Sequence, residues 1–240
     1  MIYHLSAYHS GLGDWLQYST LPEMLTRAGH TVHLWDKAEF RNAGARELIL
    51  MNPYILPPIP GAEWNLGDIP GLAYKNDQRS FIANWEAMFG MVPENDLPKI
   101  YYQPKGDKIG QLKYCEFEGI IELSSHSHKY DHASVIANVR EFILSRPDVK
   151  WTQITSDNQL GEVVIPELPK YKIRDIFHLC DVIANCKCFL SLQSGSQTLA
   201  AAIQRMNPHT EQFCILNTPD VHWIKESQKF IYPNIQYFSA

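Results

Sequence analysis

The second half of the chain alternates regularly between short apolar segments of strand type and longer segments of helical type. The order is strand 119–123, helix 132–144, strand 149–154, helix 173–183, strand 189–192, helix 196–204 and strand 213–216, with a further helix expected after Pro219. Strands connected through helices pair in parallel, with right-handed crossovers. This half is therefore expected to form a doubly wound parallel α/β sheet.

The first half begins with the same kind of unit. Residues 2–7 and 31–35 are of strand type, and apolar residues recur at helical spacing between them. Pro22 interrupts that helix, and Thr20 and Glu23 have capping-box spacing, so the helix is expected to restart or kink there. The pattern then predicts helices over 39–50 and 80–90, a short strand over 99–103, and an ordered, proline-rich loop over 52–72.

Length and composition are those of an ordinary globular protein. A chain of 240 residues, 45% hydrophobic and 20% charged, can bury one large core or two small ones. Because both halves are expected to be Rossmann-like, the boundary is placed within residues 106–113. The expected domains are an N-terminal one over 1–112 and a C-terminal one over 113–240.

The net charge and the cysteine pattern limit which binding partners and which cellular compartment are expected. The net charge of −5 gives no footprint for non-specific nucleic-acid binding, so a DNA acceptor is not favoured, although a local basic groove would permit one. Five cysteines without a C-x-x-C pair are typical of reduced thiols. The sequence shows no signal peptide and no apolar run of transmembrane length, so the cytoplasm is the expected location.

A glycine turn, Gly11-Leu12-Gly13-Asp14, comes after the first strand. Glycines allow a sharp turn and a close approach to a ligand, and the start of a helix offers free N–H groups. A dinucleotide-binding fingerprint would need a glycine at Leu16, and a P-loop would need Gly-Lys-Ser/Thr; neither is present. The pattern leaves two interpretations of Asp14 open, a helix-capping carboxylate and a catalytic one.

A second turn of this kind follows the strand over 189–192. Ser194 and Gln197 have capping-box spacing, so a helix is expected to start there, and Gly195 keeps side-chain bulk away from its first N–H groups. Such a turn can hold a diphosphate. A well-capped structural helix accounts for the same residues.

Taken together, the two turns resemble a known family. The first turn is similar to the N-terminal Gly-Asp turn of the ADP-heptose:lipopolysaccharide heptosyltransferases, the family nine glycosyltransferases. Ser194-Gly195 with Leu199-Ala200-Ala201-Ala202 resembles that family's Asp-Ser/Thr-Gly-x-x-His-Leu-Ala-Ala-Ala motif. Ile173-Arg174-Asp175-Ile176 with Cys180-Asp181 resembles the helix that precedes this motif.

The resemblance implies a GT-B fold, two Rossmann-like domains that face each other across a cleft. It also implies inverting, metal-independent transfer of a sugar from a nucleotide-diphosphate sugar to a hydroxyl acceptor, without a cofactor. Asp14 would be the general base. The donor and its diphosphate would be bound by Gly13, Lys129, Gln193, Ser194, Gly195 and Ser196. Accessory candidates are His9, Ser10, Gly11, His126 and Lys172.

The sequence departs from the family at two motif positions. Gln193 stands where the family has Asp, and Thr198 where it has His, so different contacts to the donor hydroxyls are expected. The chain is also short for the family. The sugar need not be heptose, and a glycan, a lipid-linked saccharide, a small molecule or a modified base in phage-type DNA all fit as acceptor. A nucleotide-binding protein without transferase activity and a sugar-nucleotide epimerase or hydrolase stay open as alternatives.

Two further groups of residues have a structural interpretation beside a functional one. His126, His128 and His132 lack the carboxylate or cysteine spacing of a metal site, and a solvated loop accounts for them. The aromatic residues of the first half could stack on an acceptor sugar, but core packing is the default for Trp64, Tyr74 and Trp85.

Overall fold

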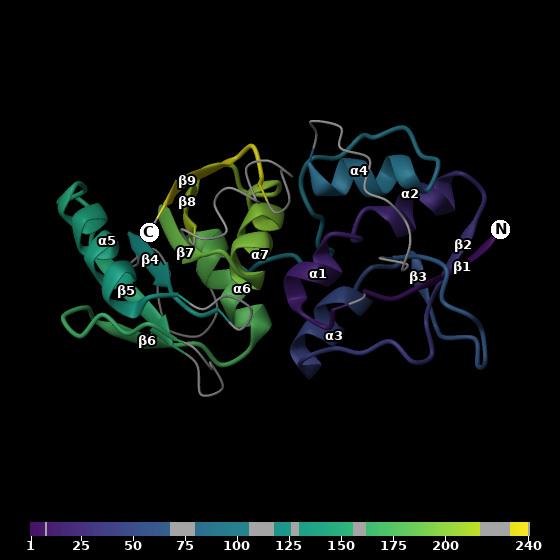
Figure 1. The fold of residues 1–240 in the computed structure, drawn as a ribbon, viewed down its shortest axis with the longest axis horizontal. Coiled ribbons are helices and arrows are strands. Elements are labelled where there is room, and N and C mark those ends of the chain that lie inside the picture. Colours follow the sequence, from purple (N-terminus) through teal and green to yellow (C-terminus); the bar gives the residue numbers. More distant parts are fainter. Residues whose placement is uncertain are drawn as a thin grey trace. The chain divides into compact units, whose positions relative to one another are not determined.

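The computed structural model describes residues 1–7, 9–67, 80–105, 118–125, 130–155, 162–216 and 231–239. The chain forms two compact units (Figure 1). Unit 1 comprises Met1–Tyr102 and Ser227–Pro233, and unit 2 comprises Gln103–Glu226 and Asn234–Ala240. The expected boundary between residues 112 and 113 lies outside the described residues and stays a prediction. Each unit is built on a parallel sheet with helices, which confirms the expected α/β class.

Unit 2 contains a six-stranded, fully parallel sheet. Across the sheet the strands are β6 (Lys170–Lys172), β5 (Trp151–Thr155), β4 (Gly119–Glu122), β7 (Cys188–Leu192), β8 (Glu211–Leu216) and β9 (Ile235–Ser239). Along the chain β4 comes first, so the strand order grows outward in both directions from the pair β4 and β7. This is the doubly wound order, and its direction reverses between those two strands.

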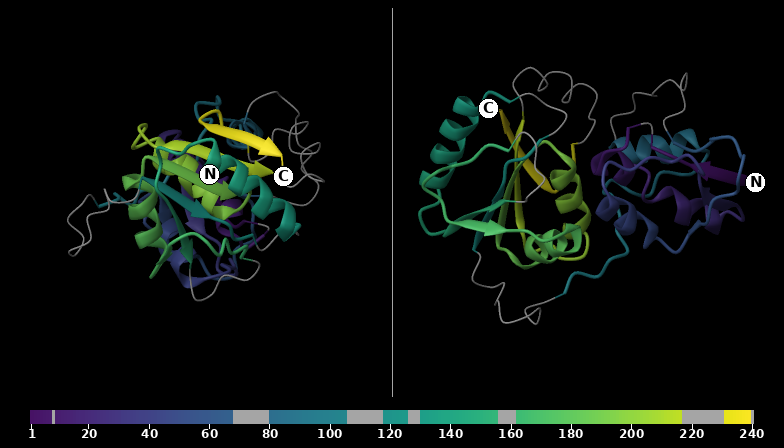
Figure 2. Two further views of the ribbon diagram at one scale, coloured as in Figure 1. Left: turned by 90° about the vertical axis from the view of Figure 1, so that its left-hand side faces the viewer. Right: turned by 90° about the horizontal axis from the view of Figure 1, so that it is seen from below.

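In the described part of unit 2, three helices cover the sheet. The helix α5 (His132–Leu144) lies against one face, and α6 (Ile176–Asn185) and α7 (Gly195–Gln204) lie against the other (Figure 1 and Figure 2). Ile121 of β4 and Leu190 of β7 pack with Val135 and Val139 of α5 in one buried core. Since successive strand residues point to opposite faces, Glu122 projects to the face that α7 covers.

Unit 1 is a smaller parallel sheet in the order β1 (Ile2–Leu5), β2 (Thr31–Leu34) and β3 (Ile55–Leu56). A parallel bridge joins Leu5 to Leu66 outside these strands. The helices of this unit are α1 (Leu12–Leu16), α2 (Leu21–Arg27), α3 (Ala43–Leu50) and α4 (Phe81–Met88). The helix α1 contacts α3, and α2 packs on β2.

The predicted break at Pro22 is confirmed, but its capping box is not. The helices α1 and α2 are separate, with Pro22 in the first turn of α2. Thr20 makes no side-chain cap and donates its hydroxyl to Glu86 of α4 at 2.7 Å. Glu23 instead binds Lys99, Tyr101 and Arg27. Both side chains of the expected box therefore serve long-range contacts.

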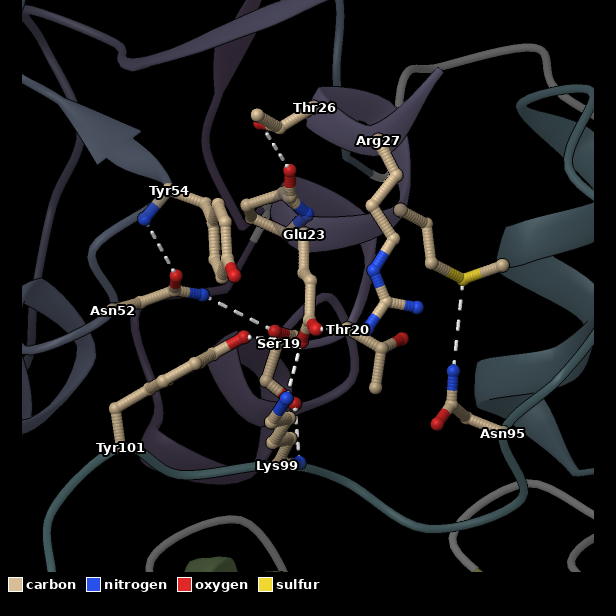
Figure 3. A network of polar contacts seen from close by, with 12 residues as sticks. Ser19, Thr20, Glu23, Thr26, Arg27, Asn52, Tyr54, Asn95, Lys99 and Tyr101 are labelled. Carbon is tan, nitrogen blue, oxygen red and sulfur yellow. Dashed lines mark hydrogen bonds and ion pairs between the residues drawn. The ribbon is translucent and has the colours of Figure 1, made fainter.

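Glu23 attaches the segment around Lys99 to α2, as Figure 3 shows. Lys99 donates to the carboxylate through Nζ, and the Tyr101 hydroxyl donates to it at 2.8 Å. Burial raises the pKa of Glu23, but the hydrogen bonds from Lys99 and Tyr101 and the nearby positive charges outweigh it, so the net pKa is lowered. The expected strand over 99–103 is wrong, because the backbone N–H of Lys99 donates to Ser19 Oγ at 2.8 Å rather than to a sheet.

The strands β3, β6 and β9 were not expected from the sequence. They are short or at an edge of the sheet, and β3 lies within the proline-rich segment over 52–72, of which residues 68–72 lie outside the described residues. The helix expected after Pro219 also lies outside them. Cys180, Cys186, Cys188 and Cys214 are buried free thiols. In the described part of the chain, no helix is long and apolar enough to cross a membrane.

Candidate active site

Asp14 lies in the first turn of α1, nine residues after Leu5, the last residue of β1. The backbone N–H groups of Asp14 and Gly11 favour its ionised form and so lower its pKa slightly. Gly11 is extended, with φ −72° and ψ 151°, and precedes the helix without a side-chain cap. Open parallel sheets bind ligands beyond the C-terminal ends of their strands, so Asp14 occupies a suitable position for a functional group.

Gly11 provides the space that the Asp14 carboxylate occupies. A Cβ atom at Gly11 would lie 2.6 Å from Asp14 Oδ2, inside van der Waals contact. The backbone dihedrals of Gly11 are accessible to any residue, so the glycine is required by this close approach and not by its conformation. The second glycine, Gly13, is buried inside α1, and its carbonyl accepts from Gln17 Nε2 at 3.3 Å. Donor binding by Gly13 stays a prediction.

The Asp14 carboxylate is partly buried and lies near the charges of His9 and Arg41. Burial raises the pKa of Asp14, and the charges of His9 and Arg41 lower it only in part, so its net pKa lies above the ordinary value of 3.8. His9 is exposed and Ser10 is partly exposed. A carboxylate of raised pKa is a better proton acceptor than an ordinary aspartate, provided that it is ionised at the working pH.

Arg41 is a residue of this site that the sequence did not single out. It follows β2, and its backbone N–H donates to the carbonyl of Ser10 at 2.8 Å. This bond ties the loop after β2 to the glycine turn after β1. Only its position in the sequence could have indicated Arg41, because it lies in the loop that follows β2, the strand next to β1.

In unit 2 the ends of β4 and β7 come together at the reversal of the strand order. Ser124 and Ser125 follow β4, and Gln193 follows β7. Ser125 Oγ donates to the carbonyl of Gln193 at 3.5 Å, and the backbone N–H of Gln193 donates to the Tyr130 hydroxyl at 3.1 Å. This is the position at which doubly wound sheets bind ligands.

The helix α7 starts where the sequence predicted. Ser194 is extended and caps the helix, because its Oγ accepts from the backbone N–H of Ser196 at 3.3 Å. Ser194, Gly195 and Ser196 are all partly exposed, so the first turn of the helix is accessible. Gln197 donates through Nε2 to the Tyr237 hydroxyl at 2.8 Å. Exposed N–H groups in the first turn of a helix of this length attract anions.

Glu122, at the end of β4, was also missed. It is fully buried and accepts the backbone N–H of Ser124 at 3.1 Å together with the Ser124 hydroxyl. The side chain of Ser196 also favours the ionised form of this carboxyl group and so lowers its pKa. Burial raises the pKa of Glu122 to about 7, although these hydrogen bonds oppose the rise. The sequence signal was a single charged residue inside the apolar run over 119–123.

The two departures from the family motif differ in their accessibility. Thr198 is 0% exposed, so it is out of reach of a ligand in this structure. Gln193 is 3% exposed, and its Oε1 atom makes no hydrogen bond to any described residue. A buried acceptor of this kind is costly unless water or a ligand satisfies it.

The remaining candidates divide into three groups. Lys129, His126, His128 and Tyr74 lie outside the described residues. Lys172 is exposed at the end of the edge strand β6. Trp85 is buried in the core, and Trp64 packs near Trp35 and donates to the carbonyl of Leu66 at 2.8 Å. Over the described ranges, no group of three or more His, Cys, Asp or Glu side chains could hold a metal ion.

Comparisons with known proteins identify the fold. The chain is similar to a family 9 glycosyltransferase from Veillonella parvula, with a TM-score of 0.61 and 8% identity, over 100% of this chain and 85% of that one. It is also similar to the E. coli ADP-heptose lipopolysaccharide heptosyltransferase II, with a TM-score of 0.58 and 11% identity, over 99% and 89% of the two chains. A third similar structure is the iron-containing dodecameric glycosyltransferase TibC of enterotoxigenic E. coli, with a TM-score of 0.54 and 11% identity.

These likenesses define a class of fold. The protein has the α/β fold of the family 9 glycosyltransferases, as the resemblance of its two turns implied. This chain covers 58% of the length of TibC, and TibC covers 90% of this chain. No protein-family model and no curated protein sequence matches the chain. At such low identity the likeness establishes the fold, and the activity is argued from the site.

Proposed function

We propose that this protein is a glycosyltransferase that moves a sugar from a nucleotide-diphosphate sugar to a hydroxyl acceptor. Support comes from one combination of observations. A chain with the fold of the family 9 glycosyltransferases carries a carboxylate of raised pKa at the C-terminal end of β1, beside Arg41 and against Gly11. A transferase needs such a group, because the acceptor hydroxyl must lose a proton as it attacks the sugar.

On this proposal Asp14 is the general base of unit 1, and α7 of unit 2 stabilises the leaving group. Charge develops on the diphosphate as its bond to the sugar breaks. The N–H groups at Ser194, Gly195 and Ser196, together with the dipole of α7, would stabilise that charge without a metal ion. The unsatisfied Oε1 of Gln193 would accept a hydrogen bond from a donor hydroxyl. Attack from the side opposite the leaving group inverts the configuration of the sugar.

For each substrate, only the chemical class is proposed. The donor is proposed as a nucleotide-diphosphate sugar, and the acceptor as a carbohydrate in the cytoplasm. DNA is the less favoured acceptor, because of the net charge of −5. One of the similar structures, TibC, is described with ADP-D-β-D-heptose, which makes ADP-sugars the first donors to test.

The test is the variant Asp14→Asn, which keeps the shape of the side chain and removes the base. A thermal-shift screen against nucleoside diphosphates and nucleotide sugars first selects the donor base. We expect kcat to fall by about 10²–10⁴-fold in the variant, with the melting temperature and the nucleotide affinity nearly unchanged. In the wild type, kcat/KM should fall on acidification with a midpoint above pH 3.8, because the pKa of Asp14 is raised.

Two results would contradict the proposal. Equal turnover in wild type and variant would show that Asp14 is not the base. Donor consumption without any acceptor would instead favour an epimerase or hydrolase, and nucleotide binding without turnover across a broad acceptor panel would favour a binding protein.

A further inference from the structure

Gln193 differs from the other buried glutamine residues in the described part of unit 2. Gln153, Gln197 and Gln212 each donate through Nε2 to a carbonyl or hydroxyl oxygen, at 2.6–2.8 Å. Gln193 makes no side-chain hydrogen bond to any described residue, although it is only 3% exposed. Burying an amide without a partner is costly, so this side chain is available to a group from outside the chain.

Gln193 is also the residue at which the strand β7 turns into the helix α7. It follows Leu192, the last residue of β7, and precedes Ser194, the N-cap of α7. The backbone conformation of Gln193 therefore sets the direction of its own side chain. The strand order reverses between β4 and β7, so this position lies in the ligand-binding region of a doubly wound sheet.

The hydroxyl of Tyr130 holds the backbone of Gln193. The backbone N–H of Gln193 donates to the carbonyl of Ile215 in β8 at 3.3 Å, which continues the ladder between β7 and β8. The same N–H donates to the Tyr130 hydroxyl at 3.1 Å, and that hydroxyl donates to the Ile215 carbonyl at 3.3 Å. The three groups form a closed set of hydrogen bonds, which fixes the peptide group from which the Gln193 side chain projects.

The carbonyl group of Gln193 is held from the same segment of the chain. Ser125 Oγ donates to it at 3.5 Å, a longer and therefore weaker bond. Ser125 is buried, and the Tyr130 ring packs against the hydrophobic core of unit 2, so both hydroxyl groups have fixed positions. Two side chains from the segment between β4 and α5 thus hold the N–H and the C=O of one residue.

We propose that Tyr130 is a positioning residue of the donor site, which together with Ser125 holds Gln193 so that its amide group contacts the sugar of the nucleotide-diphosphate donor. The inference rests on the proposed function, because it needs that donor at the start of α7. The diphosphate is bound by the N–H groups of α7, whose cap is the separate residue Ser194. Tyr130 therefore acts on the recognition of the sugar and little on that of the diphosphate.

A buried amide is suited to the recognition of sugar hydroxyl groups. It offers an acceptor in Oε1 and a donor in Nε2, and a hydroxyl group can both donate and accept. When the backbone of Gln193 is fixed, the amide is already ordered before the ligand binds, so less conformational entropy is lost on binding. Without the Tyr130 hydroxyl the amide can take other orientations, and the contact with the sugar is weakened.

The experiment is isothermal titration calorimetry on the full chain with matched ligand pairs: ADP and ADP-glucose, UDP and UDP-glucose, GDP and GDP-mannose. The pair that binds the wild type most tightly is used, and the measured quantity is the affinity for the sugar nucleotide divided by that for the nucleoside diphosphate. Tyr130→Phe keeps the ring and removes the hydroxyl. We expect it to lower this affinity ratio by about two- to tenfold and to change the affinity for the nucleoside diphosphate by less than about twofold.

A second variant and the double variant separate a positioning role from a structural one. Gln193→Met keeps the length of the side chain without its amide, so it should lower the affinity ratio at least as much as Tyr130→Phe. It should leave the melting temperature unchanged or raise it, because it removes a buried polar group that has no partner. Since Tyr130 acts through Gln193, Tyr130→Phe should have no further effect on the ratio in the Gln193→Met background.

Each single variant has a matched control. Tyr171→Phe removes a tyrosine hydroxyl that bonds to His178 beside the edge strand β6. Gln212→Met removes a buried amide that donates to the carbonyl of Ala200 at 2.7 Å, so it should lower the melting temperature. Both controls should keep the affinity ratio of the wild type. A change of the ratio in either control would show that it reports on the fold of unit 2 in general, and would overturn the inference.

The remaining outcomes distinguish this inference from the proposed function. Equal weakening of both ligands in Tyr130→Phe, or additive effects in the double variant, would show a structural role and leave the proposed function intact. Should Tyr130→Phe not fold, Ser125→Ala takes its place, with a smaller fall of the ratio because its bond to Gln193 is longer. An unchanged ratio in Ser125→Ala would then overturn the inference. Absence of binding for every nucleoside diphosphate and every sugar nucleotide would overturn both.

Discussion

At the scale of single residues, the candidate base depends on a neighbour that lacks a side chain. The Asp14 carboxylate occupies the space that a Cβ atom of Gly11 would need, and the backbone N–H of Gly11 favours its ionised form. Arg41 approaches the same place from the loop after β2. The position and the pKa of the Asp14 carboxylate therefore depend on the absence of a side chain at Gly11, on the backbone N–H of Gly11 and on the charge of Arg41.

We predict that Gly11→Ala impairs activity much more than stability. The new methyl group would lie 2.6 Å from Asp14 Oδ2, so the carboxylate must move, whereas the backbone of Gly11 already has dihedrals that alanine adopts. A displacement of this kind can cost about 10²-fold in kcat. Steady-state kinetics and a melting curve check it. A variant with wild-type kcat would show that the carboxylate can move without loss of function.

At the scale of secondary-structure elements, side chains expected to cap helices hold distant segments together. Glu23 of α2 binds Lys99 and Tyr101 (Figure 3). Thr20 binds Glu86 of α4. Glu86 also accepts the backbone N–H groups of residues 94 and 95. The extended segment that follows α4 is therefore fixed by two acidic residues and not by a sheet.

We predict that Glu23→Gln destabilises the protein by roughly 1–3 kcal/mol at pH 7, because charged hydrogen bonds to Lys99 and Tyr101 are weakened. The pKa of Glu23 is lowered in the folded state, so its contribution is present above pH 4.5 and is lost as the pH falls through the folded pKa. The difference between variant and wild type should shrink at low pH. Urea unfolding at pH 7 and at pH 3.5 measures it.

The control for this prediction is Glu94→Gln. Glu94 also pairs with Arg27, at 3.8 Å, but its side chain is 59% exposed. Exposed ion pairs contribute little, so the change should stay below about 0.5 kcal/mol at either pH. An equal loss in the two variants would argue against a specific role for the buried pair.

At the scale of the whole molecule, the end of the described chain belongs to both units. Residues Ser227–Pro233 are part of unit 1, and Asn234–Ala240 are part of unit 2. In the first segment Tyr232 is 1% exposed and accepts from Gln17 Nε2 at 2.5 Å. In the second, β9 completes the sheet beside β8. Tyr232 thus contributes to unit 1, and β9 contributes to unit 2.

We predict that Tyr232→Phe destabilises unit 1 by about 1–3 kcal/mol, because it removes the hydroxyl that accepts from buried Gln17. The matched variant is Tyr237→Phe, which removes the hydroxyl that accepts from Gln197 of α7 and should act on unit 2. Hydrogen-exchange mass spectrometry separates the two effects, with peptides from α4 reporting on unit 1 and peptides from α7 on unit 2. Loss of protection in the opposite unit would contradict the assignment.

The sequence alone was sufficient for the class of fold and for both glycine turns. Hydrophobic periodicity is a local property, so it predicted the central strands of unit 2. Two other local signals, a proline and capping-box spacing, predicted the break at Pro22 and a helix over 196–204, one residue later than the observed start of α7 at Gly195. It also placed Asp14 after the first strand. Short strands such as β3 and β6 were not predictable, because they are defined by pairing with neighbours and not by their own pattern.

Only the tertiary structure decided which side chains share a site. Ser125 meets Gln193 because the ends of β4 and β7 become adjacent where the strand order reverses, and Arg41 meets Asp14 because the ends of β1 and β2 lie in register. The tertiary structure also buries Thr198. It brings Thr20 into contact with Glu86 and Glu23 into contact with Tyr101, so these two side chains do not form the expected capping box. Such contacts join residues that are far apart in sequence. They depend on sheet register and helix crossover, which no local pattern encodes.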